Sequence, residues 1–158
     1  MGKASTLDLP VRLQEFAASR MSRNEVNRKK LSPRKRHDLD VQIGFLEGVT
    51  RRDPRFTEAL QLLGDSYSQR GRHADSLQVD RRLIRREPRN PNAYYNLACS
   101  HSLNGRADRA AIALERAISL GYRDFKWLIR DPDLSALRKH TRFRRILQQI
   151  RAIRIKVA

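Results

Sequence analysis

The chain has 158 residues, of which 39% are hydrophobic and 32% are charged. Its net charge is +17, from 34 lysines and arginines against 17 acids. Such an excess favours contact with phosphates or other anions, although an arginine-rich composition alone also produces it. Cys99 is the single cysteine, which excludes an intramolecular disulfide and a thiolate metal cluster. No apolar run approaches the length of about 18 residues that spans a bilayer, so we expect a cytoplasmic protein without a transmembrane segment.

The first 56 residues divide at Ser32-Pro33. Residues 1–31 are basic and match no repeat, and we expect this extension to be partly helical. Serine caps a helix N-terminus and proline fits the first turn, so a new helix is predicted to begin here. It would turn Ile43 and Leu46 inward and end at Asp53-Pro54. Residues 32–56 are therefore interpreted as the second half of a repeat whose first half is missing.

Two repeats of equal length follow, at residues 57–90 and 91–124. A shift of 34 residues places Leu63 on Leu97 and Gly71 on Gly105. A period of 34 is typical of a pair of antiparallel helices joined by a turn. Apolar residues recur at helical spacing on both sides of each glycine, which indicates two helices in each repeat. Gly64 and Ala98 share a position where only a small side chain lets the paired helices approach closely.

These units resemble tetratricopeptide repeats in the segments "LLGDSYSQRGRHADS" and "NLACSHSLNGRADRAAIALERAI". Residues 125–158 resemble the element that closes such arrays, in which Asp131-Pro132-Asp133-Leu134, Leu137 and Phe143 would seal the end of the core. The resemblance implies an all-α fold. It would be a right-handed superhelix of antiparallel helix pairs with a C-terminal capping helix.

The repeats depart from this family pattern at two positions. Asp80 stands where the family has a large apolar residue, and Ser76 stands where it has alanine. We expect both to weaken the packing of the first repeat. His101 occupies a position that is usually aromatic, so we expect a packed histidine and not a catalytic one.

No group of residues in the sequence predicts catalysis. The four histidines are scattered, and no two have the spacing that places a metal-binding pair on one helix face. The sequence has no glycine-rich phosphate loop and no nucleophile elbow. We therefore expect a non-enzymatic protein that needs neither a metal nor another cofactor.

The family resemblance implies that a partner protein or peptide binds the concave surface formed by the first helix of each unit. One subfamily clamps the C-terminal carboxylate of its peptide with two lysines, two asparagines and an arginine. Asn96, Lys126 and Arg130 match three of these positions. Gln61 and Asp65 replace the other two, so a complete clamp is not expected, and the three matches can also be ordinary surface residues. The candidate contact residues are Gln61, Asp65, Asn92, Tyr95, Asn96, Cys99, Lys126 and Arg130.

The positive charge gathers in two flanks, whereas the repeats between them are nearly balanced. The last segment also carries an apolar stripe that includes Phe143, Ile146 and Ile150. We interpret it as a capping helix, with a membrane-surface helix as the alternative. The flanks support a second function, a nucleic-acid- or ribosome-associated factor, and the oligomeric state stays open. The candidate anion-binding residues are Arg28, Lys29, Lys30, Arg34, Lys35, Arg36, Arg142, Arg144 and Arg145.

Overall fold

The computed structural model of the chain describes residues 31–157, with side chains up to residue 153. The extension at 1–30, with Arg28, Lys29 and Lys30, lies outside the described residues. Those that are described form helices and no strand, which confirms the all-α fold. In chain order the elements are α2 (Pro33–Arg52), α3 (Thr57–Arg70), α4 (His73–Arg86), α5 (Pro91–Leu103), α6 (Ala107–Ser119), α7 (Phe125–Arg130), the short 3-10 helix η2 (Pro132–Leu134), α8 (Ser135–Arg138) and α9 (Arg142–Val157).

Two helices begin at caps that the sequence supplies, each followed by a proline in the first turn. Ser32 at the start of α2 accepts a hydrogen bond from the backbone N–H of Lys35 at 3.2 Å. Asn90 at the start of α5 accepts from the N–H groups of Asn92 at 2.9 Å and Ala93 at 3.2 Å. These bonds satisfy backbone donors that have no partner within the helix.

The two repeats turn at equivalent glycines. Gly71 has φ 83° and Gly105 has φ 70°, a left-handed conformation that glycine adopts without the steric cost of a Cβ. The next residue closes each turn by donating its N–H to the first helix: Arg72 to Tyr67 at 2.8 Å and Arg106 to His101 at 2.9 Å. Each pair of helices is thereby folded back antiparallel.

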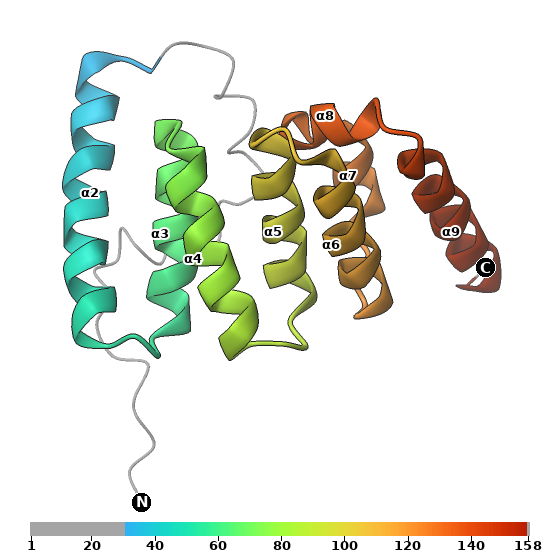
Figure 1. The fold of residues 1–158 in the computed structure, drawn as a ribbon, viewed down its shortest axis with the longest axis horizontal. Coiled ribbons are helices and arrows are strands. Elements are labelled where there is room, and N and C mark those ends of the chain that lie inside the picture. The colour runs from blue at the N-terminus through green and yellow to red at the C-terminus, as the bar shows by residue number, and fades with distance from the viewer. Residues whose placement is uncertain (1–30, 158) are drawn as a thin grey trace, which may run out of the picture. The chain divides into compact units, whose positions relative to one another are not determined.

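The helix pairs stand in a row from α2 to α6, each helix packed on the next (Figure 1). The close approach predicted at Gly64 is present between α3 and α4. A Cβ on Gly64 would lie 3.1 Å from Oδ1 of Asp80 and 3.6 Å from Cγ1 of Val79. A Cβ there would require the Asp80 side chain to shift by a few tenths of an ångström, and a larger side chain would press further against α4.

Asp80 and Ser76 do not stand as isolated polar residues in the core. Ser100 on α5 donates to Oδ2 of Asp80 at 2.6 Å, and its hydroxyl lies 3.1 Å from that of Ser76. Ser76 also donates to the carbonyl of Gly64 at 3.0 Å. All three polar side chains are buried. The departures from the family pattern thus join α3, α4 and α5 by hydrogen bonds, which single-position comparison did not anticipate.

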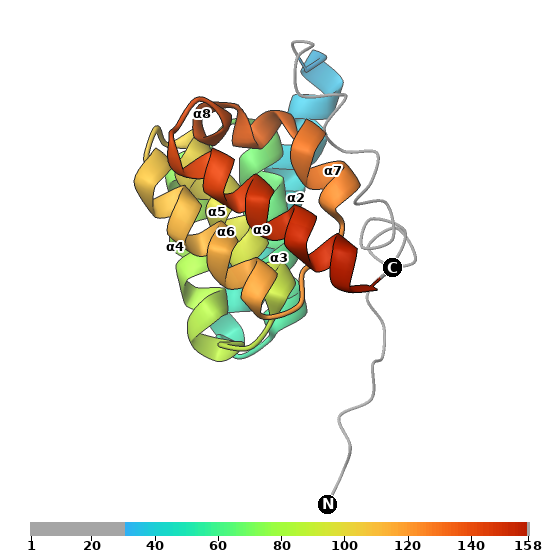
Figure 2. The same cartoon turned by 90° about the vertical axis from the view of Figure 1, so that its right-hand side faces the viewer.

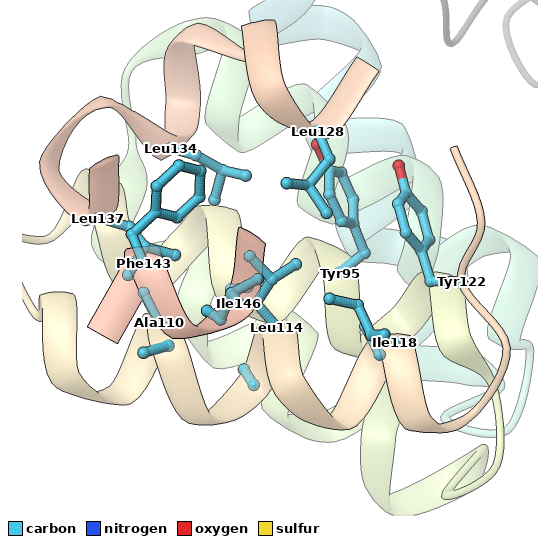
Figure 3. Packing of buried hydrophobic residues seen from close by; sticks show 14 of the residues in the cluster. Tyr95, Ala110, Leu114, Ile118, Tyr122, Leu128, Leu134, Leu137, Phe143 and Ile146 are labelled. Carbon is cyan, nitrogen blue, oxygen red and sulfur yellow. The ribbon is translucent and has the colours of Figure 1, made fainter. Parts of the chain in front are cut away.

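The C-terminal segment covers the end of the array as a cap. Figure 2 shows α9 lying across the end of the array, where it packs on α6. Leu134, Leu137 and Phe143 gather at one end of the core (Figure 3). They join Ile146 and Ile150 of α9 in one buried cluster with the inner face of α6. The apolar stripe of α9 is therefore used for packing on the last repeat.

Candidate partner-binding face

The candidate contact residues lie on α3, α5 and α7, the first helices of successive units, and we call their exposed side the first-helix face. On α3, Gln61 and Asp65 are half-buried. On α5, Asn92 is exposed in the first turn, whereas Asn96 and Cys99 are half-buried. On α7, both cations are exposed. The helices thus bring seven of the eight candidates to partly or fully accessible positions; Tyr95 is the eighth.

Tyr95 is buried and forms part of the core. Its side chain is 7% exposed, and its ring stacks on that of Tyr122 with centroids 4.3 Å apart and planes at 4° (Figure 3). Its hydroxyl donates to Oδ2 of Asp131. Burial, together with Cys99 and Asp131 nearby, raises the pKa of Tyr95 far above its ordinary value. Tyr95 therefore holds α5 to the segment after α7, and we leave it out of the contact surface.

Asp131 connects the last repeat to the terminal element. It is 1% exposed, and its Oδ2 accepts from Tyr95, from Nε1 of Trp127 at 3.0 Å and from the thiol of Cys99 at 3.7 Å. Its Oδ1 accepts from the N–H of Asp133 at 3.0 Å. The sequence alone places Asp131 in the terminal element, and it does not single out Trp127. The spacing of four residues between them was the available signal.

Cys99 offers no reactive thiolate on this face. Burial is the main cause that raises the pKa of its thiol well above the ordinary value, and the charge of Asp131 adds to it. The thiol consequently stays protonated at neutral pH. It contributes packing and a weak hydrogen bond, and it provides no nucleophile.

Charge changes sign along the first-helix face. Glu58 and Asp65 on α3 are acidic, α5 presents the amides of Asn92 and Asn96, and α7 presents Lys126 and Arg130. Nε of Arg130 donates to the backbone carbonyl of Lys126 at 3.2 Å, which draws this guanidinium toward its own helix. This bond joins two of the three clamp matches, Lys126 and Arg130, within α7. The face has an acidic end and a basic end.

The candidate anion-binding residues that the structure describes lie at two helix N-termini. Arg34, Lys35 and Arg36 occupy the exposed first turn of α2. At the start of α9, Arg144 and Arg145 are exposed and Arg142 is half-buried. Neither first turn contains an acid. Helix N-termini carry partial positive charge and favour acids, so cations there cost helix stability and intensify the local positive potential.

The described part of the chain offers neither a metal centre nor a membrane span. No cluster of three or more histidine, cysteine or acidic side chains within residues 31–157 is arranged to hold a metal ion. No helix in the same range combines the length and apolarity needed to cross a membrane.

Comparison with known proteins agrees with the geometry. Residues 62–123 match the family model for the tetratricopeptide repeat. The chain is also similar to a chloroplastic protein of Arabidopsis thaliana, with 32% identity over 106 residues. That alignment covers 65% of this chain and 30% of the relative, so the chain spans less than a third of the relative's length. The match supports a tetratricopeptide-repeat segment at residues 62–123 of this chain.

Proposed function

We propose that this protein is a non-enzymatic scaffold that binds a partner protein or peptide through the first-helix face. The observation that carries the proposal is the change of charge along α3, α5 and α7. An extended peptide with a basic segment near α3 and an acidic segment or C-terminal carboxylate near α7 would complement it. The half-buried amide of Asn96 between them is suited to a peptide backbone, because it can both donate and accept hydrogen bonds.

Affinity capture with charge-reversal variants tests this proposal. The face variant changes Lys126 and Arg130 to Glu, and the matched control changes Arg86 and Arg89 to Glu, which alters net charge equally on α4 and the residues after it. Each protein is used as bait with and without nuclease treatment. We expect a protein partner that survives nuclease, is lost with the face variant and is retained by the control. Equal retention by both variants would exclude α7 from the interface.

A second function, phosphate contact through the basic flanks, is supported by the two acid-free helix N-termini of α2 and α9. The protein would then be a nucleic-acid- or ribosome-associated factor. Its phosphate contacts would be hydrogen bonds donated by Arg34, Lys35, Arg36, Arg142, Arg144 and Arg145. Helix N-termini bind anions through backbone N–H groups and the helix dipole, and the cations add to both. The salt dependence of RNA binding separates this function from nonspecific attraction.

A further inference from the structure

A pocket between the leading half repeat and the first repeat is lined by charges of both signs. The pocket has a volume of about 490 Å³ and lies between α2 and α4, with Tyr67 of α3 among its lining residues. The Tyr67 hydroxyl donates to Oε1 of Glu47 at 2.6 Å, and the guanidinium of Arg72 lies 4.5 Å from the Tyr67 ring centroid. Arg72 also pairs with Asp75 at 2.7 Å and with Glu47 at 3.8 Å. Two acids, one arginine and a phenol thus form one bonded group.

The second repeat places different chemistry at the same four positions. A shift of 34 residues replaces Tyr67 by His101 and Arg72 by Arg106. The same shift replaces both acids by arginine, Glu47 by Arg81 and Asp75 by Arg109. We call Arg81, His101, Arg106 and Arg109 the His101 cluster. Where the first repeat has two acids and one arginine, this cluster has three arginines.

The side chain that these arginines flank, by equivalence with Tyr67 of the first repeat, is buried. His101 is 6% exposed, and its Nδ1 has no hydrogen-bond partner among the described residues. Burial lowers the pKa of His101 to about 4, and the charges of Arg81, Arg106 and Arg109 contribute to that shift. Arg106 lies beside His101, because its backbone N–H donates to the His101 carbonyl at 2.9 Å. Glu47, the equivalent of Arg81, contacts Tyr67, the equivalent of His101, at 2.6 Å. The imidazole stays neutral at physiological pH.

The nearby acids do not neutralise the cluster. No described acid forms a salt bridge with any of its three arginines. Asp80, next to Arg81 in the chain, is buried and accepts the hydrogen bond from Ser100. Asp108, next to Arg109, has an oxygen 3.1 Å from Nε2 of His140. In the first repeat, by contrast, Arg72 has its own acid partners.

We propose that the His101 cluster is a binding site for a phosphate-type oxyanion, either inorganic phosphate or a phosphomonoester. Arginine forks donate paired hydrogen bonds to tetrahedral oxyanions, and three of them match a dianion better than a single carboxylate. The neutral imidazole adds hydrogen-bonding capacity that no described residue uses. The site shares no residue with the first-helix face, so it is independent of the scaffold proposed above.

Titration with inorganic phosphate tests the site. Binding is followed by calorimetry and by the arginine Nε–H and histidine ring signals in NMR, in 0.15 M NaCl and a phosphate-free buffer. The cluster variant carries Arg81→Gln and Arg109→Gln, and the matched control carries Arg86→Gln and Arg89→Gln. All four side chains are partly or fully exposed, so neither pair of changes disturbs the core. The control removes the same charge from the same helix and its C-terminal flank.

We expect saturable binding that shifts the His101 signals. The cluster variant should bind at least about tenfold more weakly, because charge-assisted hydrogen bonds are each worth more than the free energy of a tenfold change. The control should change affinity by less than about twofold. O-phosphoserine, titrated in parallel, identifies the source: tighter binding than phosphate indicates a phosphorylated protein, and equal or weaker binding indicates free phosphate. Absence of saturable binding, or an equal loss in both variants, would overturn the proposal.

Discussion

Ser100 of α5 donates a hydrogen bond of 2.6 Å to the buried carboxylate of Asp80 on α4. The positions equivalent to Asp80, one repeat before and one repeat after, are Leu46 and Leu114, and both are fully buried. The chain therefore holds one acid in a row of leucines. It does so where two serines, Ser76 and Ser100, lie within hydrogen-bond distance of each other.

Removing Ser100 alone from the Ser76–Asp80–Ser100 network should lower the free energy of unfolding more than removing Ser100 and Asp80 together. Ser100→Ala leaves Asp80 buried without its 2.6 Å donor and should lower the free energy of unfolding by about 1–3 kcal/mol. Adding Asp80→Leu gives the position the residue of its neighbours, so the double variant should recover part of that loss. Urea denaturation of both single variants and the double variant forms a mutant cycle. A coupling free energy near zero would show that the two side chains act independently.

Two glycines within helices are expected to respond oppositely to substitution. Gly64→Leu should destabilise the protein by about 1–3 kcal/mol, because a Cβ there already lies 3.1 Å from Asp80. A Cβ added to Gly44, on the exposed side of α2, would meet no atom within 4 Å. Gly44→Ala should therefore stabilise by roughly 0.5–1 kcal/mol through helix propensity. Urea denaturation measures both, and a neutral Gly64→Leu would contradict the observed packing of α3 on α4.

How far the sequence predicted this molecule depends on the range of the contacts involved. The period of 34 and the glycine turns are local signals, and the structure folds each helix pair back at the predicted glycines, Gly71 and Gly105. The burial of Tyr95 depends on Tyr122 and Asp131, and the latter lies 36 residues away. No spacing rule within α5 contains that information.

The same distinction holds for the charges. The positive and negative charges of the two repeats nearly cancel in total. Their uneven distribution between the repeats becomes clear only when equivalent positions are compared in the structure. The sequence shows that Arg81 takes the place of Glu47 one period later. The effect of this change of charge depends on the side chain that faces each residue. Tyr67 faces Glu47 with a hydroxyl at 2.6 Å, whereas the imidazole of His101 is influenced by three arginines.

Burial of neutral His101 should make the stability of the protein depend on pH. The pKa of His101 is lowered to about 4 in the folded chain, against an ordinary value of 6.5, so the unfolded chain binds more protons between these values. Stability is therefore fully present above about pH 6.5 and is lost as the pH falls toward 4. Burial lowers the pKa of His73 as well, which acts in the same direction.

His101→Phe isolates this contribution, because phenylalanine fills a similar volume and does not titrate. The free energy of unfolding of wild type and variant is compared at pH 7 and pH 4.5 in phosphate-free buffers, since the His101 cluster is proposed to bind phosphate. Wild type should lose more stability than the variant over this interval. Parallel loss in the two proteins would show that His101 does not titrate with a lowered pKa.

The salt dependence of nucleic-acid binding decides the function of the basic flanks. Each phosphate that a cation neutralises releases a counterion, so affinity for RNA falls linearly with salt on logarithmic axes. A protein with a net charge of +17 binds RNA weakly at low salt whatever its function, so binding alone is uninformative. The slope for wild type is compared with two variants, Arg34, Lys35 and Arg36 to Gln, and Arg142, Arg144 and Arg145 to Gln. Each change should reduce the slope by roughly one unit per phosphate contact removed. A functional site should keep a Kd of about 1 μM or lower at physiological salt, whereas nonspecific binding has a Kd of about 1 μM or higher. Binding that disappears near 0.15 M salt, where the screening length is about 8 Å, would assign the charge to nonspecific attraction and leave the first-helix face as the functional surface.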